Sequence, residues 1–464
     1  MTQAPLPPKP AARTGRSSVL RLMRLFRADI LSALPARLYR AWMAEYRTPF
    51  FRSYLCNDPA LVERVLKTEP ANFPKSMRLT EGLRPLLHNS VFVTNGAEWE
   101  HQRRIIDRAF EGGRLHENLP AMWAAGQSCL RRMHAKINHE PIEIEAETSH
   151  AAADVIFRTL FSLPIEDQAA SAVFHAFRAH QRAMPIVNAA ALMAWPRGFP
   201  RFHSRATRTS ARHIRRLIEA LTAARAEAIR TGTAPDDLAT KIMTLADPQT
   251  GTRFETAETV DQVAIFFLAG HETSASALAW ALYLLATHPD WQDRVAAEAQ
   301  DVLATPDPDL SRLSQLRASR AVFRETLRLY PPVPMLVREN RCPVHFRGRD
   351  IAKGAQIVLS PWHLHRHERI WDNPDAFDPA RWDTENGRAA ARSAYIPFSA
   401  GPRVCPGAGF AMAEGPLLLS MITRDFRLEP VAGQTPVPVA HLTVRARDGI
   451  WLRLIPRGDS DYSR

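Results

Sequence analysis

The stretch YIPFSAGPRVCPGAGFAMAEG, residues 395–415, places Cys405 between prolines and glycines, directly ahead of an apolar helical pattern. Prolines restrict the backbone and glycines permit tight turns, so the segment before the cysteine is predicted to be an irregular loop. A helix is predicted after Gly409, and its first amides and its dipole would favour the thiolate form of Cys405. The alternative is a structural cysteine in a turn, because free cysteine usually packs as a small apolar side chain.

The composition is that of an ordinary globular protein, with 464 residues, 45% of them hydrophobic and 23% charged. A chain of this length can bury a large core and still enclose a cofactor. Its four cysteines are widely spaced and form no CxxC pair, which indicates a reducing, cytoplasmic compartment. The net charge of +12 fits an acidic protein or an anionic membrane surface. The sequence contains no Lys/Arg-dense run with interleaved aromatic residues, so binding to nucleic acid is not predicted.

The N-terminal region divides into two parts. Residues 1–17 are Pro-rich and are predicted to be a disordered tail, and residues 18–464 are predicted to form one domain. Residues 19–40 are interrupted by arginine every few positions, so they cannot form a spanning helix. Their apolar residues fall on one helical face, which allows a helix lying on a membrane surface, although packing on the protein's own core is favoured. That face comprises Val19, Leu22, Met23, Phe26 and Ile30.

The rest of the chain reads as mainly α-helical with small β-sheets. A strand, a turn and a helix with Asp58 as its N-cap are predicted over 48–69, followed by an irregular region to about Gly96. Most of 119–245 is predicted to be helical. Residues 256–288 are too apolar all round for a surface helix, so this helix should run through the core. A final hairpin is predicted from 441–446 and 449–454.

Two patterns within these helices carry possible chemistry. In AGHET, residues 269–273, glycine costs about 1 kcal/mol against alanine, so something should approach the backbone closely at Gly270. Glu272 and Thr273 could relay protons; the alternative is a glutamate in an ion pair and a threonine bonded to its own helix. In EWEHQRR, Trp99 and Arg103 are spaced to offer an indole N–H and a guanidinium to one anionic ligand.

Several motifs together resemble one family. FSAGPRVCPG, residues 398–407, matches in full the Phe-x-x-Gly-x-Arg-x-Cys-x-Gly haem signature of the cytochrome P-450 superfamily. AGHET is similar to its central-helix motif, ETLR at 325–328 to its Glu-x-x-Arg motif, and FDPARW at 377–382 to its Pro-Glu-Arg-Phe segment. The resemblance covers 48–454, is that of a bacterial-type soluble member, and implies a single large haem-enclosing domain.

The resemblance also implies roles for individual residues. Cys405 would be the proximal thiolate ligand of the iron of haem b. The other implied haem contacts are Phe398, Arg403, Gly407, Trp99, Arg103 and Arg338. Glu325 and Arg328, with Arg381, would brace the loop that carries the cysteine. Two departures occur in the bracing segment, where Ala380 replaces the usual glutamate and Trp382 the frequent phenylalanine.

The implied reaction is insertion of one oxygen atom from dioxygen into a hydrophobic molecule such as a fatty acid, a terpenoid or an aromatic compound. A thiolate ligand favours O–O cleavage. Gly270 would leave room for dioxygen, while Glu272 and Thr273 would deliver protons. Haem-thiolate isomerases, dehydratases, peroxide-driven hydroxylases and haem sensors are alternatives, against which the acid–alcohol pair argues. The predicted substrate-pocket residues are Phe266, Phe267, Ala269, Met335, Leu336 and Val337, with residues 79–92 as a loop closing over them.

Two further expectations concern metals and partners. His363, His365 and His367 would share one face of a strand, which raises the alternative of a separate metal site. No Gly-rich flavin or dinucleotide segment follows Cys405, so electrons should come from a separate ferredoxin or flavodoxin-like protein with its reductase. The basic charge suits such an acidic partner. Its candidate contacts are Arg104, Arg108 and Arg392.

Overall fold

The computed structural model describes residues 5–13, 15, 24–25, 29–47, 51–111, 114–137, 140–183, 203–304, 310–440 and 442–458. Most of the apolar face predicted at the N-terminus lies outside these ranges, as does the Pro/Trp-containing segment near residue 196. Residues 5–13, within the segment expected to be a disordered tail, lie against the fold. Pro7 and Pro10 are buried there, and Tyr330 Oη donates to Pro8 O at 2.8 Å. Proline can be buried in this way because it has no N–H to leave unsatisfied.

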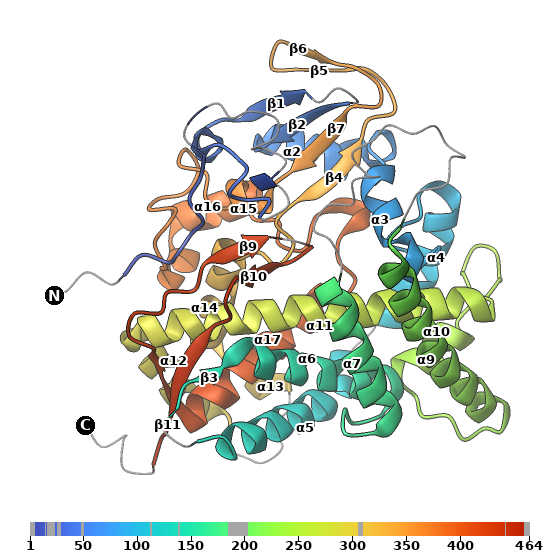
Figure 1. Ribbon diagram of the computed structural model, residues 1–464, viewed down its shortest axis with the longest axis vertical. Coiled ribbons are helices and arrows are strands. Elements are labelled where there is room, and N and C mark those ends of the chain that lie inside the picture. The colour runs from blue at the N-terminus through green and yellow to red at the C-terminus, as the bar shows by residue number, and fades with distance from the viewer. Residues whose placement is uncertain are drawn as a thin grey trace.

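The prediction of a mainly helical fold with small sheets is confirmed, and the long apolar helix α11 (Thr256–Thr287) crosses its centre (Figure 1). Most α11 residues are buried, and a reciprocal capping box between Glu255 and Glu258 defines its start. The other helices are α2 (Pro59–Glu63), α3 (Met77–Leu87), α4 (Gly96–Phe110), α5 (Arg114–His134), α6 (Ile144–Phe161), α7 (Gln168–Ala183), α9 (Arg205–Arg230), α10 (Leu238–Thr244), α12 (Pro289–Val302), α13 (Leu310–Leu313), α14 (Arg317–Leu329), α15 (Pro361–Leu364), α16 (Glu385–Ala394) and α17 (Ala408–Asp425). Short helical turns are η1 (Ala36–Tyr39), η2 (Arg64–Thr68), η3 (Pro70–Asn72), η4 (Pro379–Asp383) and η5 (Gly401–Arg403).

The strands form small sheets at the edges of this helical body. They are β1 (Met43–Arg47), β2 (Arg52–Cys56), β3 (Ile142–Glu143), β4 (Leu336–Glu339), β5 (Val344–Phe346), β6 (Arg349–Ile351), β7 (Gln356–Leu359), β8 (Phe426–Pro430), β9 (Pro438–Ala440), β10 (Val444–Ala446) and β11 (Trp451–Pro456). Their orders are β1-β2-β7-β4, β3-β11-β8, β10-β9 and β5-β6. The predicted hairpin of 441–446 with 449–454 is wrong, because β10 pairs with β9 while β11 pairs with β3 and β8. Alternation alone identifies strands but does not choose their partners.

The helix predicted after the first strand is present as α2, with the Asp58 carboxylate accepting from two backbone N–H groups. The irregular region expected to reach Gly96 is wrong in part, because it contains α3, whose N-cap is Ser76. Residues 79–92 are therefore largely this helix and not a loop. Pro85 lies inside α3, and because proline usually interrupts a helix, the sequence does not indicate a helix here.

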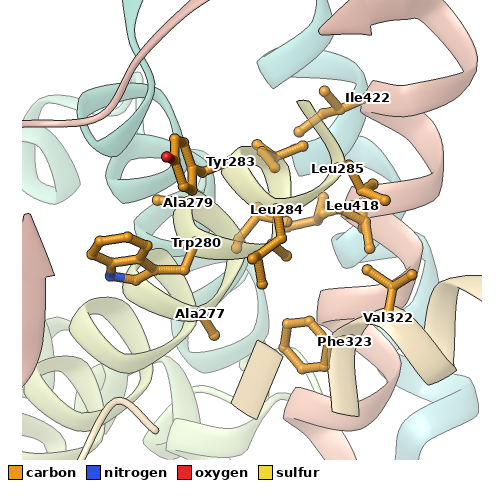
Figure 2. Packing of buried hydrophobic residues seen from close by; sticks show 14 of the residues in the cluster. Ala277, Ala279, Trp280, Tyr283, Leu284, Leu285, Val322, Phe323, Leu418 and Ile422 are labelled. Atoms are coloured by element: carbon orange, nitrogen blue, oxygen red, sulfur yellow. The ribbon is translucent and has the colours of Figure 1, made fainter. Parts of the chain in front are cut away.

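The core lies where α11 meets α14 and α17. Figure 2 shows Leu284 of α11 near Phe323 of α14 and Leu418 of α17, whereas Trp280 points to the other side of α11. Trp280 also stacks on Tyr330, with ring centroids 4.0 Å apart. Because α17 begins just after Cys405, this packing fixes the cysteine loop against the central helix.

Candidate active site

The backbone around Cys405 is held in place on both sides. Gly401 has φ of +68°, and a Cβ there would lie 1.9 Å from the carbonyl oxygen of Leu66, so only glycine fits. The Cys405 N–H donates to Phe398 O at 2.9 Å, and α17 begins three residues later. The Cys405 side chain is exposed, while Phe398 is partly buried and packs against the core. The loop thus presents a thiol on a backbone that cannot easily shift.

The charge state of Cys405 differs from what the helix end alone predicts. The side chain is accessible, but the surrounding protein desolvates the sulfur, and this burial raises the pKa of the thiol above its ordinary value. A backbone hydrogen bond from Gly407 and the charge of Arg103 lower the pKa of Cys405 by less. The amide at the helix end therefore acts in the expected direction on the pKa of Cys405, while burial of the sulfur is the larger influence.

Basic side chains gather beside this loop around the indole ring of Trp99. The Arg403 guanidinium lies 4.9 Å and Lys75 Nζ 5.7 Å from the Trp99 ring centroid. Arg338 is only 7% exposed and lies close enough to Arg403 to feel its charge, so it belongs to the same group. Burial, and then the charge of Arg403, lower the pKa of Arg338 to about 10. Among the described residues, Nε of Arg338 and Nε of Arg403 are buried without a hydrogen-bond partner. The cluster is thus an unneutralised concentration of positive charge.

Lys75 is a member of this cluster that the sequence reading did not single out. Its pKa lies well below the ordinary value, because of burial and then of Arg403, Arg338 and Arg103. Lys75 Nζ donates to the carbonyl oxygens of Val91 and Thr94. The only sequence signal was its position in the segment NFPKS, residues 72–76, which resembles the family.

Arg103 has partners of its own. Its Nε donates to Asp107 Oδ1 at 2.7 Å within α4, and its Nη1 donates to Val404 O at 2.6 Å. Arg103 therefore ties α4 directly to the residue before Cys405.

Near its middle, the mostly buried central helix α11 has an accessible turn. Ala269 is exposed and Thr273 is half-buried, although their neighbours on α11 are mostly buried. Thr273 Oγ1 donates to Ala269 O at 2.6 Å, so its hydroxyl is held along this accessible turn. The close approach expected at Gly270 comes from α6, because a Cβ there would lie 2.3 Å from Ile156 Cδ1.

Glu272 points to different partners from Thr273. Its buried carboxylate accepts from Gln181 Nε2 at 2.9 Å and from Thr443 Oγ1 at 2.6 Å, and it pairs with Arg445. The ion pair and the back-bonded threonine, named above as the alternative to a relay, are thus both present.

A second acid near α11 was not found from the sequence. Glu414 of α17 is fully buried and accepts from Ser274 Oγ at 2.7 Å, and burial raises its pKa to about 8. Its other oxygen has no partner among the described residues. The Glu414–Ser274 contact joins the helix after Cys405 to the helix that carries Thr273.

The structure brings Glu325, Arg328 and Arg381 together. The Arg328 guanidinium donates to both Glu325 oxygens at 3.0 and 2.8 Å, and Arg381 Nε donates to Glu325 Oε1 at 2.9 Å. Arg328 also donates to the carbonyl oxygens of His365 and Pro374. These residues are buried, so the triad fastens α14 to the segment that precedes the cysteine loop.

The predicted substrate-pocket residues fall into two groups. Phe267 is 1% exposed, its ring centroid lying 4.9 Å from Phe157 and 4.5 Å from Phe177, so it belongs to the core and not to an accessible surface. Its position on the helix turns it away from Ala269. The partly exposed or exposed members are Phe266, Ala269, Met335, Leu336 and Val337.

The alternative metal site at the three histidines is wrong, because residues 361–364 form the short helix α15 and not a strand. His363 Nδ1 contacts Ser360 Oγ, His365 Nε2 accepts from Ile396 N, and His367 stacks on Trp42. Within the part of the chain that the structure describes, no three His, Cys, Asp or Glu side chains are grouped to hold a metal ion.

The arginines considered for an electron-donating partner differ in availability. Arg104 is held by the Asp247 carboxylate through two contacts of 2.7 Å, and Arg108 Nη1 donates to Ala246 O at 2.9 Å. Arg392 is exposed.

Comparison with known proteins identifies the class. The family model for cytochrome P450 matches residues 42–451. The fold is that of the haem domain of cytochrome P450DA, with a TM-score of 0.80 at 24% identity and 98% coverage of both chains. The chain therefore belongs to the cytochrome P450 family.

Named relatives narrow this assignment to a type of enzyme. Cyclooctat-9-en-7-ol 5-monooxygenase from Streptomyces melanosporofaciens is 32% identical over 424 residues, covering 89% of this chain and 88% of that protein. Human cytochrome P450 4F2 is 28% identical over 450 residues, covering 90% and 83%. The protein is a cytochrome P450 monooxygenase, for which the family implies haem. Within the described ranges, no helix is long and apolar enough to cross a membrane.

Proposed function

We propose that the protein binds haem b through Cys405 and inserts one oxygen atom from dioxygen into a hydrophobic small molecule. The observation that carries this proposal is an accessible thiol beside a partly buried group of cations with no acidic partner among the described residues. Haem offers an iron that accepts a thiolate and carries two propionate carboxylates, so this donor set suits both parts of the cofactor. When bound, haem supplies dioxygen activation and oxygen transfer.

Each residue of the cluster has a defined task in this proposal. Cys405 ligates the iron, and the Gly407 amide holds the sulfur by a hydrogen bond. Arg338, Arg403 and Lys75 neutralise the propionates, with the indole N–H of Trp99 as a further donor. Arg103 keeps the cysteine loop against α4, and Phe398 shields the sulfur from one side.

The accessible turn of α11 handles protons. Thr273 Oγ1 holds a proton that it donates to Ala269 O, and delivery of this proton to substrate-side oxygen would require the hydroxyl to turn away from that carbonyl. Glu272 is fixed by Arg445 and Thr443, so proton uptake at its carboxylate requires release from that ion pair. Gly270 lets α6 pack closely and so keeps this turn at a fixed position.

The accessible apolar side chains of β4 and α11 support a hydrophobic substrate. One relative that spans 89% of this chain is named cyclooctat-9-en-7-ol 5-monooxygenase. Cyclic terpenoid alcohols therefore come first in a substrate panel, before fatty acids and aromatic compounds. A ferredoxin or flavodoxin-like protein with its reductase supplies the electrons.

The test begins with the purified protein loaded with haem. The reduced carbon monoxide complex should show the Soret position of thiolate-ligated haem, and panel members should perturb the resting spectrum. Turnover with a ferredoxin, its reductase and labelled dioxygen should place one labelled oxygen atom in the product. A histidine-type Soret band, or turnover with peroxide alone and none with dioxygen and electrons, would overturn the proposal.

A further inference from the structure

The first half of α9 carries a row of arginines that the proposed reaction does not use. Arg205, Arg208, Arg212 and Arg216 are separated by three or four residues, so they share one face of the helix. All four are exposed. We refer to these four residues as the arginine face.

Other arginines of the same helix are treated differently by the fold. Arg215 is buried and pairs with Asp261 at 2.7 Å, and Arg225 is buried and pairs with Asp237 at 2.7 Å. None of the four residues of the arginine face is paired with a carboxylate among the described residues. The two buried arginines of α9 are therefore neutralised by carboxylates, whereas the exposed arginine face can still bind an anion.

The side chains of this face also form a shaped surface. Arg205, Arg208 and Arg212 line a pocket of about 420 Å³. Arg212 Nε donates to Arg208 O at 3.3 Å, which fixes one guanidinium along the helix. Like charges at these spacings destabilise an isolated helix, so the row is unfavourable by itself and becomes favourable beside an anion.

The position of α9 argues against the electron donor as the occupant. In its principal contacts, α9 packs on α3, α7, α10 and α11, whereas α17, which follows Cys405, packs on α5, α11, α12, α14 and β8 (Figure 1). A protein that reduces a cysteine-ligated iron must approach the cysteine loop. The arginine face lies on other elements and fits a different anionic partner.

We propose that the arginine face binds the phosphate groups of an anionic phospholipid surface. A helix with clustered arginines on one polar face is attracted to acidic lipids, by about fivefold in affinity for each residue near the surface. Residues 203–219 contain no Phe, Tyr or Trp to stack on bases, which argues against single-stranded nucleic acid. Contact with lipid would also bring the enzyme to a store of hydrophobic substrate.

The experiment uses the full-length haem-loaded protein and sedimentation with vesicles of equal parts phosphatidylglycerol and phosphatidylcholine. The test variant combines Arg205→Gln, Arg208→Gln and Arg212→Gln. The matched control combines Arg388→Gln, Arg427→Gln and Arg453→Gln, which removes the same charge from exposed positions on α16, β8 and β11. We expect the test variant to bind about a hundredfold more weakly, and the control to stay within a few-fold of the parent protein.

Added salt should weaken binding of the parent protein, and vesicles of pure phosphatidylcholine should not bind it. Equal losses in the test and control variants would overturn the proposal, because net charge alone would then explain binding. A test variant with unchanged vesicle binding but slower reduction by a ferredoxin would also overturn it, in favour of a protein partner. Neither readout requires product formation, so failure of the proposed reaction would leave this result distinct.

Discussion

Two groups of charge, one buried and one partly buried, behave in opposite ways in this protein. In the first, Glu325 accepts from Arg328 and Arg381, and the remaining N–H groups of Arg328 reach backbone carbonyls. In the second, around Trp99, Lys75, Arg338 and Arg403 gather without a carboxylate among the described residues.

The difference separates a structural network from a binding site. A buried charge is costly unless it is paired and hydrogen-bonded, so the satisfied triad completes itself within the chain. In the cluster around Trp99, guanidinium nitrogens lack hydrogen-bond partners among the described residues. Burial, and then the neighbouring positive charges, lower the pKa values of Lys75 and Arg338. Such a group is completed by an anion from outside, which is the role we assign to the haem propionates.

The largest expected effect lies at the sulfur of Cys405, two residues after Arg403 of the second group. Replacing Cys405 with serine should abolish monooxygenation and remove the thiolate-type Soret band of the reduced carbon monoxide complex. Haem should still be retained in part, because the cations remain. Normal turnover by Cys405→Ser would break the assignment of the ligand.

The triad predicts a loss of stability. Glu325→Gln should lower the free energy of unfolding by about 3–5 kcal/mol, because two buried arginines lose their countercharge. Urea unfolding of the haem-free protein measures this. The control is Glu227→Gln, which removes a fully surface-exposed partner of Arg230 at the same helical spacing and should cause no measurable change. Equal stability of both variants would contradict the comparison.

The cation cluster predicts the opposite pattern. Arg338→Met should leave the stability of the haem-free protein unchanged or higher, since Arg338 is buried beside Arg403. Transfer of haem to a haem-accepting protein should become about tenfold faster, because a charge-assisted contact is lost. If the substitution instead destabilised the haem-free protein as strongly as Glu325→Gln, the distinction between the two groups would fail.

Proton handling separates Thr273 from Glu272. Thr273→Ala should reduce the product formed per electron consumed by several-fold, with the balance released as peroxide, while haem content stays the same. Peroxide and product assays in the presence of a ferredoxin measure this ratio. Thr287→Ala, which removes a similarly back-bonded hydroxyl at the far end of α11, is the control. An unchanged ratio for Thr273→Ala would move the relay to another group.

The last prediction concerns the pH dependence of stability that Glu414, a buried acid without a cation among the described residues, should cause. Its folded-state pKa of about 8 exceeds the ordinary value of 4.5, so its neutral form is favoured in the fold. Stability should therefore decline as pH rises from about 4.5 to 8, by at most about 1.4 kcal/mol per pH unit, and level off above. Glu414→Gln should remove this part of the slope in unfolding measured between pH 6 and 9. An identical slope in the variant would show that folding does not raise the pKa of Glu414.

Much of the site could be read directly from the sequence. The prolines and glycines around Cys405 predict an irregular loop, and the apolar pattern of 256–288 predicts a buried helix. The Glu325–Arg328 pair lies within one helical turn, so its spacing allows contact, whereas its bracing role was implied by the family resemblance. These are local constraints, and residues close in sequence report them.

The tertiary structure decided what distant segments do to one another. Lys75 joins the cations near Cys405 although it lies in another part of the chain, and β10 pairs with β9 where a hairpin with β11 was expected. Desolvation outweighs the helix end at Cys405, and Phe267 turns into the core one position from Phe266. Sequence determined the class of chemistry because local motifs specify it. Partners and charge states depend on long-range packing, burial and Coulomb interactions, which only the folded arrangement fixes.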